Sequence, residues 1–155
     1  MDIYEKLKEL NIDLPQAPGA KASYVPVKVV GNLAHLSGQG AFLDGKLINT
    51  GRVGRDITVE QAQAAARQTA INILATLHEH IGDLNRVVSV VKLLGFVASA
   101  DGFNDQPLVI NAASELFIEV FGESGRHARS AIGVNELPMG MSVEIESVFE
   151  LDIRE

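Results

Sequence analysis

The 155-residue chain contains no cysteine. This absence excludes disulfide bonds, thiolate nucleophiles and zinc sites with cysteine ligands. The chain also lacks any apolar stretch that approaches the roughly 20 residues needed to span a bilayer. Its N-terminal segment is charged throughout, without a basic region followed by an apolar one, so the sequence shows no signal peptide. These absences predict a cytoplasmic protein without a membrane partner.

Positive charge is also scarce, because 13 lysines and arginines stand against 20 aspartates and glutamates, for a formal net charge of -7. Binding to a phosphate backbone depends on lysine and arginine contacts, and the chain has no basic patch interleaved with aromatic residues. Nucleic acid is therefore not expected as the main partner.

Motifs for metals, nucleotides and serine nucleophiles are absent too. His78 and His80 would point in different directions from a helix, and no H-E-x-x-H spacing occurs. The glycines of GRVGRD (residues 51–56) match neither the Rossmann nor the P-loop pattern. Ser37 has no G-x-S-x-G context, and we expect it to mark a strand end where its backbone groups and those of Gly38 are free. The sequence thus predicts neither a metal nor a cofactor.

The remaining composition is that of an ordinary globular protein, with 46% hydrophobic and 21% charged residues. A chain of this length can bury a sizeable core. It has no internal repeat, low-complexity tract or linker, which predicts one domain over residues 1–155. Residues 1–14 are expected to form an N-terminal helical extension, because Ile3, Leu7 and Leu10 fall on one helical face.

Local patterns predict two longer helices and several strands. Thr58 and Gln61 form a capping box before an apolar helical repeat that ends at Gly82. A second helix is expected from Pro107 to Gly122. Alternating or β-branched runs predict strands at 24–30, 33–39, 86–99, 129–134 and 141–149, with tight turns at 31–32 and 44–45. This order predicts an α+β fold of two layers, in which two helices cover one face of a mixed sheet.

The last two expected strands carry charges at unusual positions. Alternation puts Arg129 on one face of the first strand and assigns the opposite face, which includes Ile132, to the core. It puts Glu144 and Glu146 together on the polar face of the second strand. If the two strands pair through the turn at 135–140, Arg129 and both glutamates share one surface of the sheet.

This surface has two interpretations. The first is a solvated sheet face with a cross-strand ion pair that contributes ~0.2–1 kcal/mol, and periodicity alone favours it. In the second, Arg129 binds a carboxylate through both arms of its guanidinium, and a nearby glutamate holds a water or takes a proton.

The stretch ARSAIGVNELPMGMSVEIES (residues 128–147) resembles the C-terminal signature of the RidA family, also called YjgF or L-PSP proteins. That signature runs Arg-Ser, an alternating strand, Leu-Pro and an Ile/Val-Glu-Ile-Glu strand. The resemblance extends to YVPVKVVGNLAHLSGQ (24–39), GDLNRVVSVVKLLGFV (82–97) and VINAASELFIEVF (109–121), in matching order. It therefore covers about residues 15–152.

The resemblance implies a chorismate-mutase-like fold that assembles as a homotrimer with three clefts between subunits. It also implies an enamine/imine deaminase that binds a small carboxylate substrate. Such an enzyme hydrolyses reactive 2-aminoacrylate-type intermediates, released by PLP-dependent enzymes, to 2-keto acids and ammonia. The family activity needs neither a cofactor nor a metal.

The resemblance also implies roles for individual residues. The residues that match the family's site are Arg129 and Glu144, expected to be catalytic, and Tyr24, Ser37, Gly38 and Asn111, expected to bind substrate. The arginine would hold the substrate carboxylate, and the glutamate would orient water. The tyrosine would line the cleft and the glycine would supply a backbone contact. Glu146 matches no family role.

Some features differ from the compact family pattern. Ala131 stands where many members have cysteine, and both the N-terminal helix and the segment 100–109 add length. Arg126 and His127 lie beside the cleft arginine, and together these features predict a longer branch of the family. Two other functions stay open: a non-catalytic trimer that binds 2-keto acids, and the RNA cleavage reported for some members. The acidic charge argues against RNA cleavage.

Overall fold

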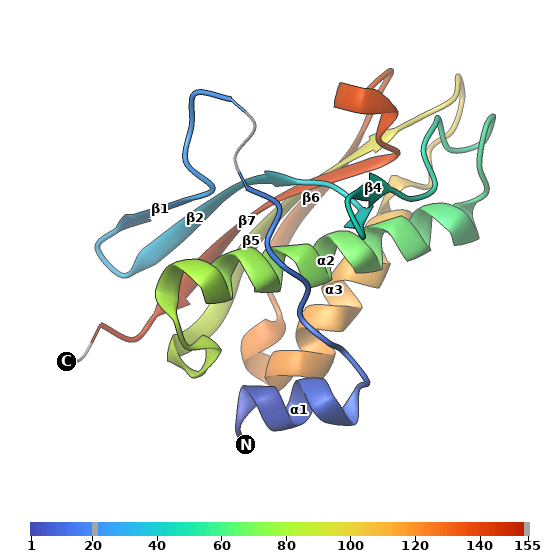
Figure 1. Ribbon diagram of the computed structural model, residues 1–155. Helices are drawn as coiled ribbons and strands as arrows, with labels where there is room; N and C mark the ends of the chain where they lie inside the picture. The colour runs from blue at the N-terminus through green and yellow to red at the C-terminus, as the bar shows by residue number, and fades with distance from the viewer. Residues whose placement is uncertain (20–21, 154–155) are drawn as a thin grey trace.

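The structure, a computed structural model, describes residues 1–19 and 22–153 and contains a five-stranded sheet packed on two long helices (Figure 1). The strands occur in the order β1-β2-β7-β5-β6, in which β6 runs parallel to β5 and all other neighbours are antiparallel. Their bounds are β1 Val27–Val30, β2 Leu33–Gln39, β5 Val87–Ala98, β6 Ala128–Val134 and β7 Val143–Leu151.

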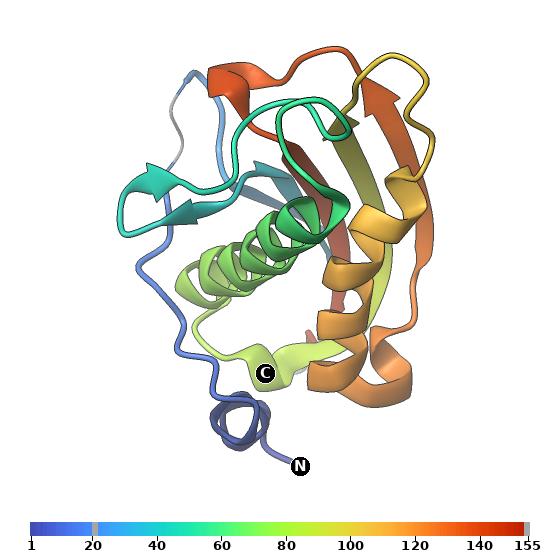
Figure 2. The ribbon, with the colours of Figure 1, turned by 90° about the vertical axis from the view of Figure 1, so that its right-hand side faces the viewer.

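Both long helices, α2 (Val59–Ile81) and α3 (Gln106–Phe121), lie on the same face of the sheet (Figure 2). The expected arrangement of two helices on one face of a mixed sheet is therefore confirmed. The capping box is also present, because the Gln61 N–H donates to Thr58 Oγ1 at 3.1 Å and the Thr58 N–H donates to Gln61 Oε1 at 2.9 Å. Gly82, with a φ of 81°, ends α2 in the left-handed conformation that suits glycine.

The core lies between these helices and the sheet. On α2 the side chains of Ala62, Ala66 and Ala70 are fully buried, and their small size lets the helix approach the sheet closely. On the sheet, Gly95 of β5 leaves room for Ile110 of α3, because a Cβ at Gly95 would stand 2.6 Å from Ile110 Cδ1. The helices are therefore held tightly against the central strands.

Both tight turns occur where they were predicted. Gly31-Asn32 joins β1 to β2. Asp44 and Gly45, with φ angles of 52° and 79°, join β3 (Phe42–Leu43) to β4 (Lys46–Leu47) in a separate small sheet. Two consecutive positive φ angles are typical of the type I′ hairpin turn, which glycine and aspartate favour.

The N-terminal segment forms the short helix α1 (Ile3–Glu9), within the expected extension. Its Tyr4 hydroxyl lies 2.8 Å from His78 Nδ1 on α2 and accepts a hydrogen bond from the Leu84 N–H at 2.8 Å. α1 also packs against α3 and the short helix η1 (Leu84–Arg86), at the end of the molecule seen at the bottom of Figure 2. The extension is thus anchored to the helix layer.

The expected pairing of the last two strands is wrong, because β5 lies between β6 and β7. Arg129 is opposite Leu93, a fully buried residue that faces the helices, whereas Glu144 is opposite Phe96. Leu93 and Phe96 are three positions apart in one strand and so point to opposite faces. Arg129 therefore lies on the helix side of the sheet, and Glu144 and Glu146 lie on the other side.

Alternation also assigned the wrong face of β6 to the core. Ile132, expected inside, is 44% exposed, and Ala131 packs against the core instead. The physical reason is that α3 connects β5 to a parallel β6 at the edge of the sheet, so the small residues of β6 lie under the helix. Local alternation separates two faces but does not show which one is covered.

Candidate functional site

The guanidinium of Arg129 is held against α3. Its Nη1 donates to Asn111 Oδ1 at 2.8 Å and to Ser114 Oγ at 3.2 Å. Asn111 and Ser114 are three residues apart on α3 and so share one face of the helix. Arg129, Asn111, Ser114 and His127 are called the arginine cluster below. It brings together two of the expected site residues, Arg129 and Asn111.

His127 completes this cluster from the segment that precedes β6. Its Nε2 lies 2.8 Å from Ser114 Oγ, and its Nδ1 lies 2.7 Å from the Gly125 carbonyl oxygen. The imidazole ring also meets the ring of Phe117 edge to face. Burial lowers the pKa of His127 below its usual value, the hydrogen bond to Gly125 opposes this shift, and the positive charge of Arg129 reinforces it. Folding therefore favours the neutral form of the ring beside Arg129.

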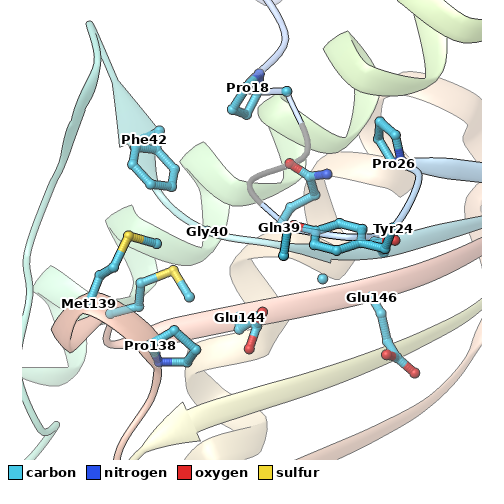
Figure 3. Close-up of a pocket in the computed structure, with 15 residues that line it drawn as sticks. Pro18, Tyr24, Pro26, Gln39, Gly40, Phe42, Pro138, Met139, Glu144 and Glu146 are labelled. Carbon is cyan, nitrogen blue, oxygen red and sulfur yellow. The ribbon is translucent and has the colours of Figure 1, made fainter.

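A cavity of about 540 Å³ lies beside β2 and β7, bordered by the segment before β1 and the short helix η3 (Pro138–Gly140). It brings together the other four expected site residues, Tyr24, Ser37, Gly38 and Glu144. Figure 3 shows the Tyr24 ring and the Glu144 carboxylate facing this space from two different segments. This space is called the glutamate cavity below.

A bulge in β2 brings Gly38 next to Glu144. The pairing of β2 with β7 gains one extra residue on β2 between Leu36 and Gln39. A Cβ at Gly38 would stand 2.6 Å from Glu144 Oε1, so only a glycine leaves the carboxylate in its observed place. Bulges of this kind are frequent beside active sites, where they redirect side chains.

The carboxyl group of Glu144 is partly buried. Burial raises the pKa of Glu144 above its ordinary value, and the negative charge of Glu146 on the same strand adds to this effect. A carboxyl group with a raised pKa is suited to both accept and donate a proton. The arrangement can therefore support general acid–base chemistry at Glu144.

The end of the glutamate cavity next to η3 is apolar. It is lined by Phe42, Pro138, Met139 and Met141, of which the first three are labelled in Figure 3. Met139 has a φ of 60°, a left-handed conformation that costs about 1–2 kcal/mol for a residue other than glycine. Such strained positions concentrate at ligand sites. Sequence reasoning did not identify these four residues, because Phe42 of β3 is far in the chain from the other three, which lie in or next to η3.

The backbone around Ser37 differs from expectation. Its N–H is not free, because it donates to the Pro26 carbonyl at 3.0 Å. Its hydroxyl donates to the Val25 carbonyl at 2.7 Å. These bonds hold the segment that carries Tyr24 against β2, so Ser37 shapes the wall of the cavity.

The two residues expected beside Arg129 also differ from each other. His127 belongs to the arginine cluster, whereas Arg126 is exposed and pairs with Glu123 at 3.1 Å. Ser114 was not identified from the sequence. Its spacing of three residues from Asn111 on a predicted helix is the signal that could have revealed it.

The arginine cluster supplies a cation, Arg129, and the glutamate cavity supplies the carboxyl group of Glu144 and the phenol of Tyr24. Among residues 1–19 and 22–153, no group of three or more histidine, aspartate or glutamate side chains is placed to hold a metal ion. No helix in the same part of the chain has the length and apolar character needed to cross a membrane.

A family model described as "YjgF/chorismate mutase-like, putative endoribonuclease" matches residues 5–149. The chain belongs to the YjgF/RidA family. Protein TCP17 of Trypanosoma cruzi is 43% identical over 147 residues, which cover 94% of this chain and 92% of the relative. The 2-iminobutanoate/2-iminopropanoate deaminase of Dermatophagoides farinae is 30% identical over 141 residues, which cover 91% of this chain and 95% of the relative.

A solved structure is similar in both fold and sequence. The crystal structure of protein Atu1372 from Agrobacterium tumefaciens is 49% identical in sequence and superposes with a TM-score of 0.91. The match covers 97% of this chain and 92% of the other. The resemblance to the YjgF/RidA family, first carried by residues 128–147, is confirmed by the family model over residues 5–149.

Proposed function

We propose that this YjgF/RidA protein is an enamine/imine deaminase whose active sites lie between the subunits of a homotrimer. It would hydrolyse 2-aminoacrylate-type intermediates to 2-keto acids and ammonia. The observation that carries the proposal is the separation of the arginine cluster from the glutamate cavity, on opposite sides of one sheet. A small substrate needs both a carboxylate anchor and an acid–base group, so a second copy of the chain would supply one of them.

Arg129 suits the carboxylate of such a substrate. Its Nη1 is already bonded to Asn111 and Ser114, and a guanidinium held in this way can bind a carboxylate with its remaining arms. The name of the 30% identical relative from Dermatophagoides farinae specifies 2-iminobutanoate and 2-iminopropanoate, which are small carboxylates. Both observations support a substrate anchored through its carboxylate.

Glu144 suits the hydrolytic step. A protonated imine is electrophilic without a cofactor, so the site has only to position water and move protons. The Glu144 carboxylate takes a proton from water as the water oxygen bonds to the imine carbon, which gives a carbinolamine. Glu144 then returns that proton to the amino group, and the C–N bond breaks with release of ammonia. The hydroxyl proton passes through solvent water to the released ammonia, which becomes ammonium, as the carbonyl group of the 2-keto acid forms.

The other walls of the glutamate cavity suit the rest of the substrate. Tyr24 and the backbone at Gly38 would border the imine carbon, next to Glu144. The apolar end, formed in part by Phe42 and Met139, would receive the substrate side chain. We therefore expect imines with apolar side chains longer than a methyl group to be accepted as well.

A trimer would also cover the face of the sheet opposite the helices. On that face, Val30 is 60% exposed and Ile132 is 44% exposed. Apolar side chains on an open sheet face commonly mark an interface, and a copy of the same chain is the usual partner. Arg129 lies on the edge strand β6, where a neighbouring copy can reach it.

An imine-hydrolysis assay tests the proposed activity. The purified protein is mixed with an amino-acid dehydratase and threonine or serine, and the decay of the imine is followed. We expect the protein to accelerate the decay and Arg129→Ala to abolish the acceleration. Arg126→Ala is the matched control, because it removes an exposed arginine that pairs with Glu123. A fully active Arg129→Ala variant would contradict the site assignment.

Mixed oligomers test whether the site is shared between copies. Arg129→Ala and Glu144→Gln, each expected to be inactive alone, are co-expressed and the mixed assemblies are verified by native mass spectrometry. If the two residues come from different copies, random mixing restores an intact pair at about one quarter of the sites. Activity should return to about that level. Mixed trimers that remain inactive, or a monomer in sedimentation, would rule out a shared site.

Binding of 2-keto acids without catalysis is a second candidate function, because it uses the same anchored Arg129. Unchanged imine decay together with measurable 2-ketobutyrate binding would favour this function over the deaminase. RNA cleavage, which the family description names, would show rates that fall steeply with salt. The net charge of -7 argues against it.

A further inference from the structure

The hydrogen bonds behind Arg129 form a continuous chain. We propose that Ser114 and His127 are positioning residues, which fix Nη1 of Arg129 and leave the Nε–Nη2 edge of the guanidinium to bind the carboxylate of a ligand. The inference rests on the proposed function, in which Arg129 is the carboxylate anchor. It adds two residues that the resemblance of the sequence to the family did not assign.

Chemistry sets the direction of each bond in this chain. The Gly125 carbonyl oxygen can only accept, so Nδ1 of His127 carries the proton across 2.7 Å. The other nitrogen of the neutral ring, Nε2, is then an acceptor, and the Ser114 hydroxyl donates to it across 2.8 Å. The Ser114 oxygen keeps its lone pairs, which accept from Nη1 of Arg129 at 3.2 Å. Every donor in the chain therefore has one acceptor.

The same counting defines the free edge of Arg129. The second N–H of Nη1 donates to Asn111 Oδ1 at 2.8 Å, so both protons of Nη1 are used. The three remaining N–H groups are on Nε and Nη2. Within residues 1–19 and 22–153 they have no hydrogen-bond partner. The Nε–Nη2 edge forms the fork that matches the two oxygens of a carboxylate.

This series of hydrogen bonds requires a neutral His127. Protonation would convert Nε2 into a donor, so the Ser114 O–H would lose its acceptor and have to turn away, and it would add a second positive charge beside Arg129. The ring is packed by Ser114 and Phe117 from α3, and by the Gly125 carbonyl from η2 (Gly122–Gly125). Arg129 is the charged group that acts on it from β6. Protonation of His127 should therefore loosen the carboxylate anchor.

Three variants separate this role from a purely structural one. His127→Phe keeps a ring against Phe117 but has no acceptor, and Ser114→Ala removes the link to Arg129. His127→Gln keeps an acceptor for Ser114 and does not titrate. Binding of 2-ketobutyrate, measured by calorimetry at mildly alkaline pH, should weaken about tenfold in the first two variants and stay near wild type in the third. In the imine assay, KM should rise more than kcat, because a carboxylate anchor acts in the ground state and the transition state alike.

The pH profile gives a signature that damaged packing would not produce. Between about pH 8 and about pH 5, the Kd of the wild-type protein for 2-ketobutyrate should rise as His127 gains a proton, whereas His127→Gln should lack this component. Any contribution from Glu144 is common to both proteins and cancels in the comparison. In addition, ¹⁵N NMR at mildly alkaline pH should find the His127 proton on Nδ1.

A matched control comes from a histidine outside the arginine cluster. His78 Nδ1 also meets a hydroxyl group, that of Tyr4 at 2.8 Å, so His78→Phe makes the same chemical change away from Arg129. We expect it to leave the Kd unchanged. If His127→Phe does not fold, the Kd of Ser114→Ala for 2-ketobutyrate tests the proposal instead. Thermal unfolding then checks that this variant keeps its structure.

Several outcomes would overturn the positioning role. They are a wild-type Kd in Ser114→Ala, the same pH response in His127→Gln as in the wild type, or a proton on Nε2 of His127. Absence of 2-ketobutyrate binding by the wild-type protein would overturn it too. Binding without imine hydrolysis, by contrast, would contradict the deaminase alone, and the Kd values would still decide the role of Ser114 and His127.

Discussion

The arginine cluster and the glutamate cavity lie on opposite sides of one sheet, and their charged groups have opposite surroundings. Arg129 donates two hydrogen bonds to side chains of α3 before any ligand arrives, and His127 supports one of them through Ser114. Glu144 is instead partly buried beside a second carboxylate, Glu146, and its pKa is raised. The protein stabilises its cation in one place and destabilises its carboxylate anion in the other.

This difference fits two separate proposed roles, substrate binding for Arg129 and proton transfer for Glu144. A group that binds a substrate carboxylate benefits from being held rigidly, because less conformational entropy is lost on binding. A group that transfers protons benefits from a pKa moved toward neutral pH. We therefore expect changes in the arginine cluster around Arg129 to act mainly on KM, and changes in the glutamate cavity around Glu144 to act mainly on kcat.

The largest expected effect within this comparison is that of Glu144→Gln. The amide keeps the shape of the side chain but cannot take a proton from water, so kcat for imine hydrolysis should fall about 10²–10⁴-fold with little change in KM. Steady-state kinetics measure both. Glu79→Gln is the control, because Glu79 is exposed on α2 and does not line the glutamate cavity, and it should stay near wild type. A rise in KM at constant kcat would instead make Glu144 a binding residue.

The next largest effect is expected for Gly38→Ala. The added methyl group would stand 2.6 Å from Glu144 Oε1 and displace the carboxylate, which should lower kcat about tenfold. The fold should tolerate the change, because the end of the glutamate side chain can move aside. An unchanged kcat would show that the observed position of the Glu144 carboxylate is not needed.

Gly95→Ala provides the matched contrast to Gly38→Ala. Its methyl group would stand 2.6 Å from Ile110 Cδ1, inside the core, where overpacking costs about 1–3 kcal/mol of unfolding free energy. Urea denaturation should therefore detect Gly95→Ala, while kinetics should detect Gly38→Ala. If both variants lost stability and kcat to the same extent, the packing contacts of the core and those of the cavity would not have different roles.

The smallest expected effect is on stability, and its sign differs between the two regions. The raised pKa of Glu144 means that folding favours its protonated form, so this contribution to stability is present at acid pH and lost as pH rises through that pKa. Near neutral pH, Glu144→Gln should therefore exceed the wild type by about 0.5 kcal/mol, allowing for solvent screening. The difference should shrink as pH falls. A difference independent of pH would contradict the shift.

His127 should behave in the opposite way. Its pKa is lowered, so folding favours the neutral ring, and the wild-type protein should lose stability as pH falls from the ordinary pKa of histidine through the lowered one. His127→Gln should not show this loss. Urea denaturation across the acid range measures how the unfolding free energy of each protein changes with pH. If the contributions of Glu144 and His127 changed in the same direction with pH, the contrast between the two regions would be removed.

Much of the fold could be predicted because its signals are local. The Thr58–Gln61 capping box, the stop at Gly82 and the Asp44-Gly45 turn are each satisfied by atoms a few residues away. The family could be predicted as well, because several sequence stretches resembled it in order, and the family model matches residues 5–149. The apolar end of the glutamate cavity could not be predicted, because Phe42 of β3 and Met139 of η3 line one cavity only when these distant segments come together.

The sequence by itself determined the main helices and strands, their order and the unusual positions of the charges at Arg129 and Glu144. Only the tertiary structure decided that these two residues lie on opposite sides of the sheet, with β5 between their strands. Alternation relates side chains within one strand, whereas the face that a strand presents depends on its neighbours and on which helix covers them. The neighbours of a strand are determined by contacts between segments far apart in the chain, so local periodicity cannot predict them.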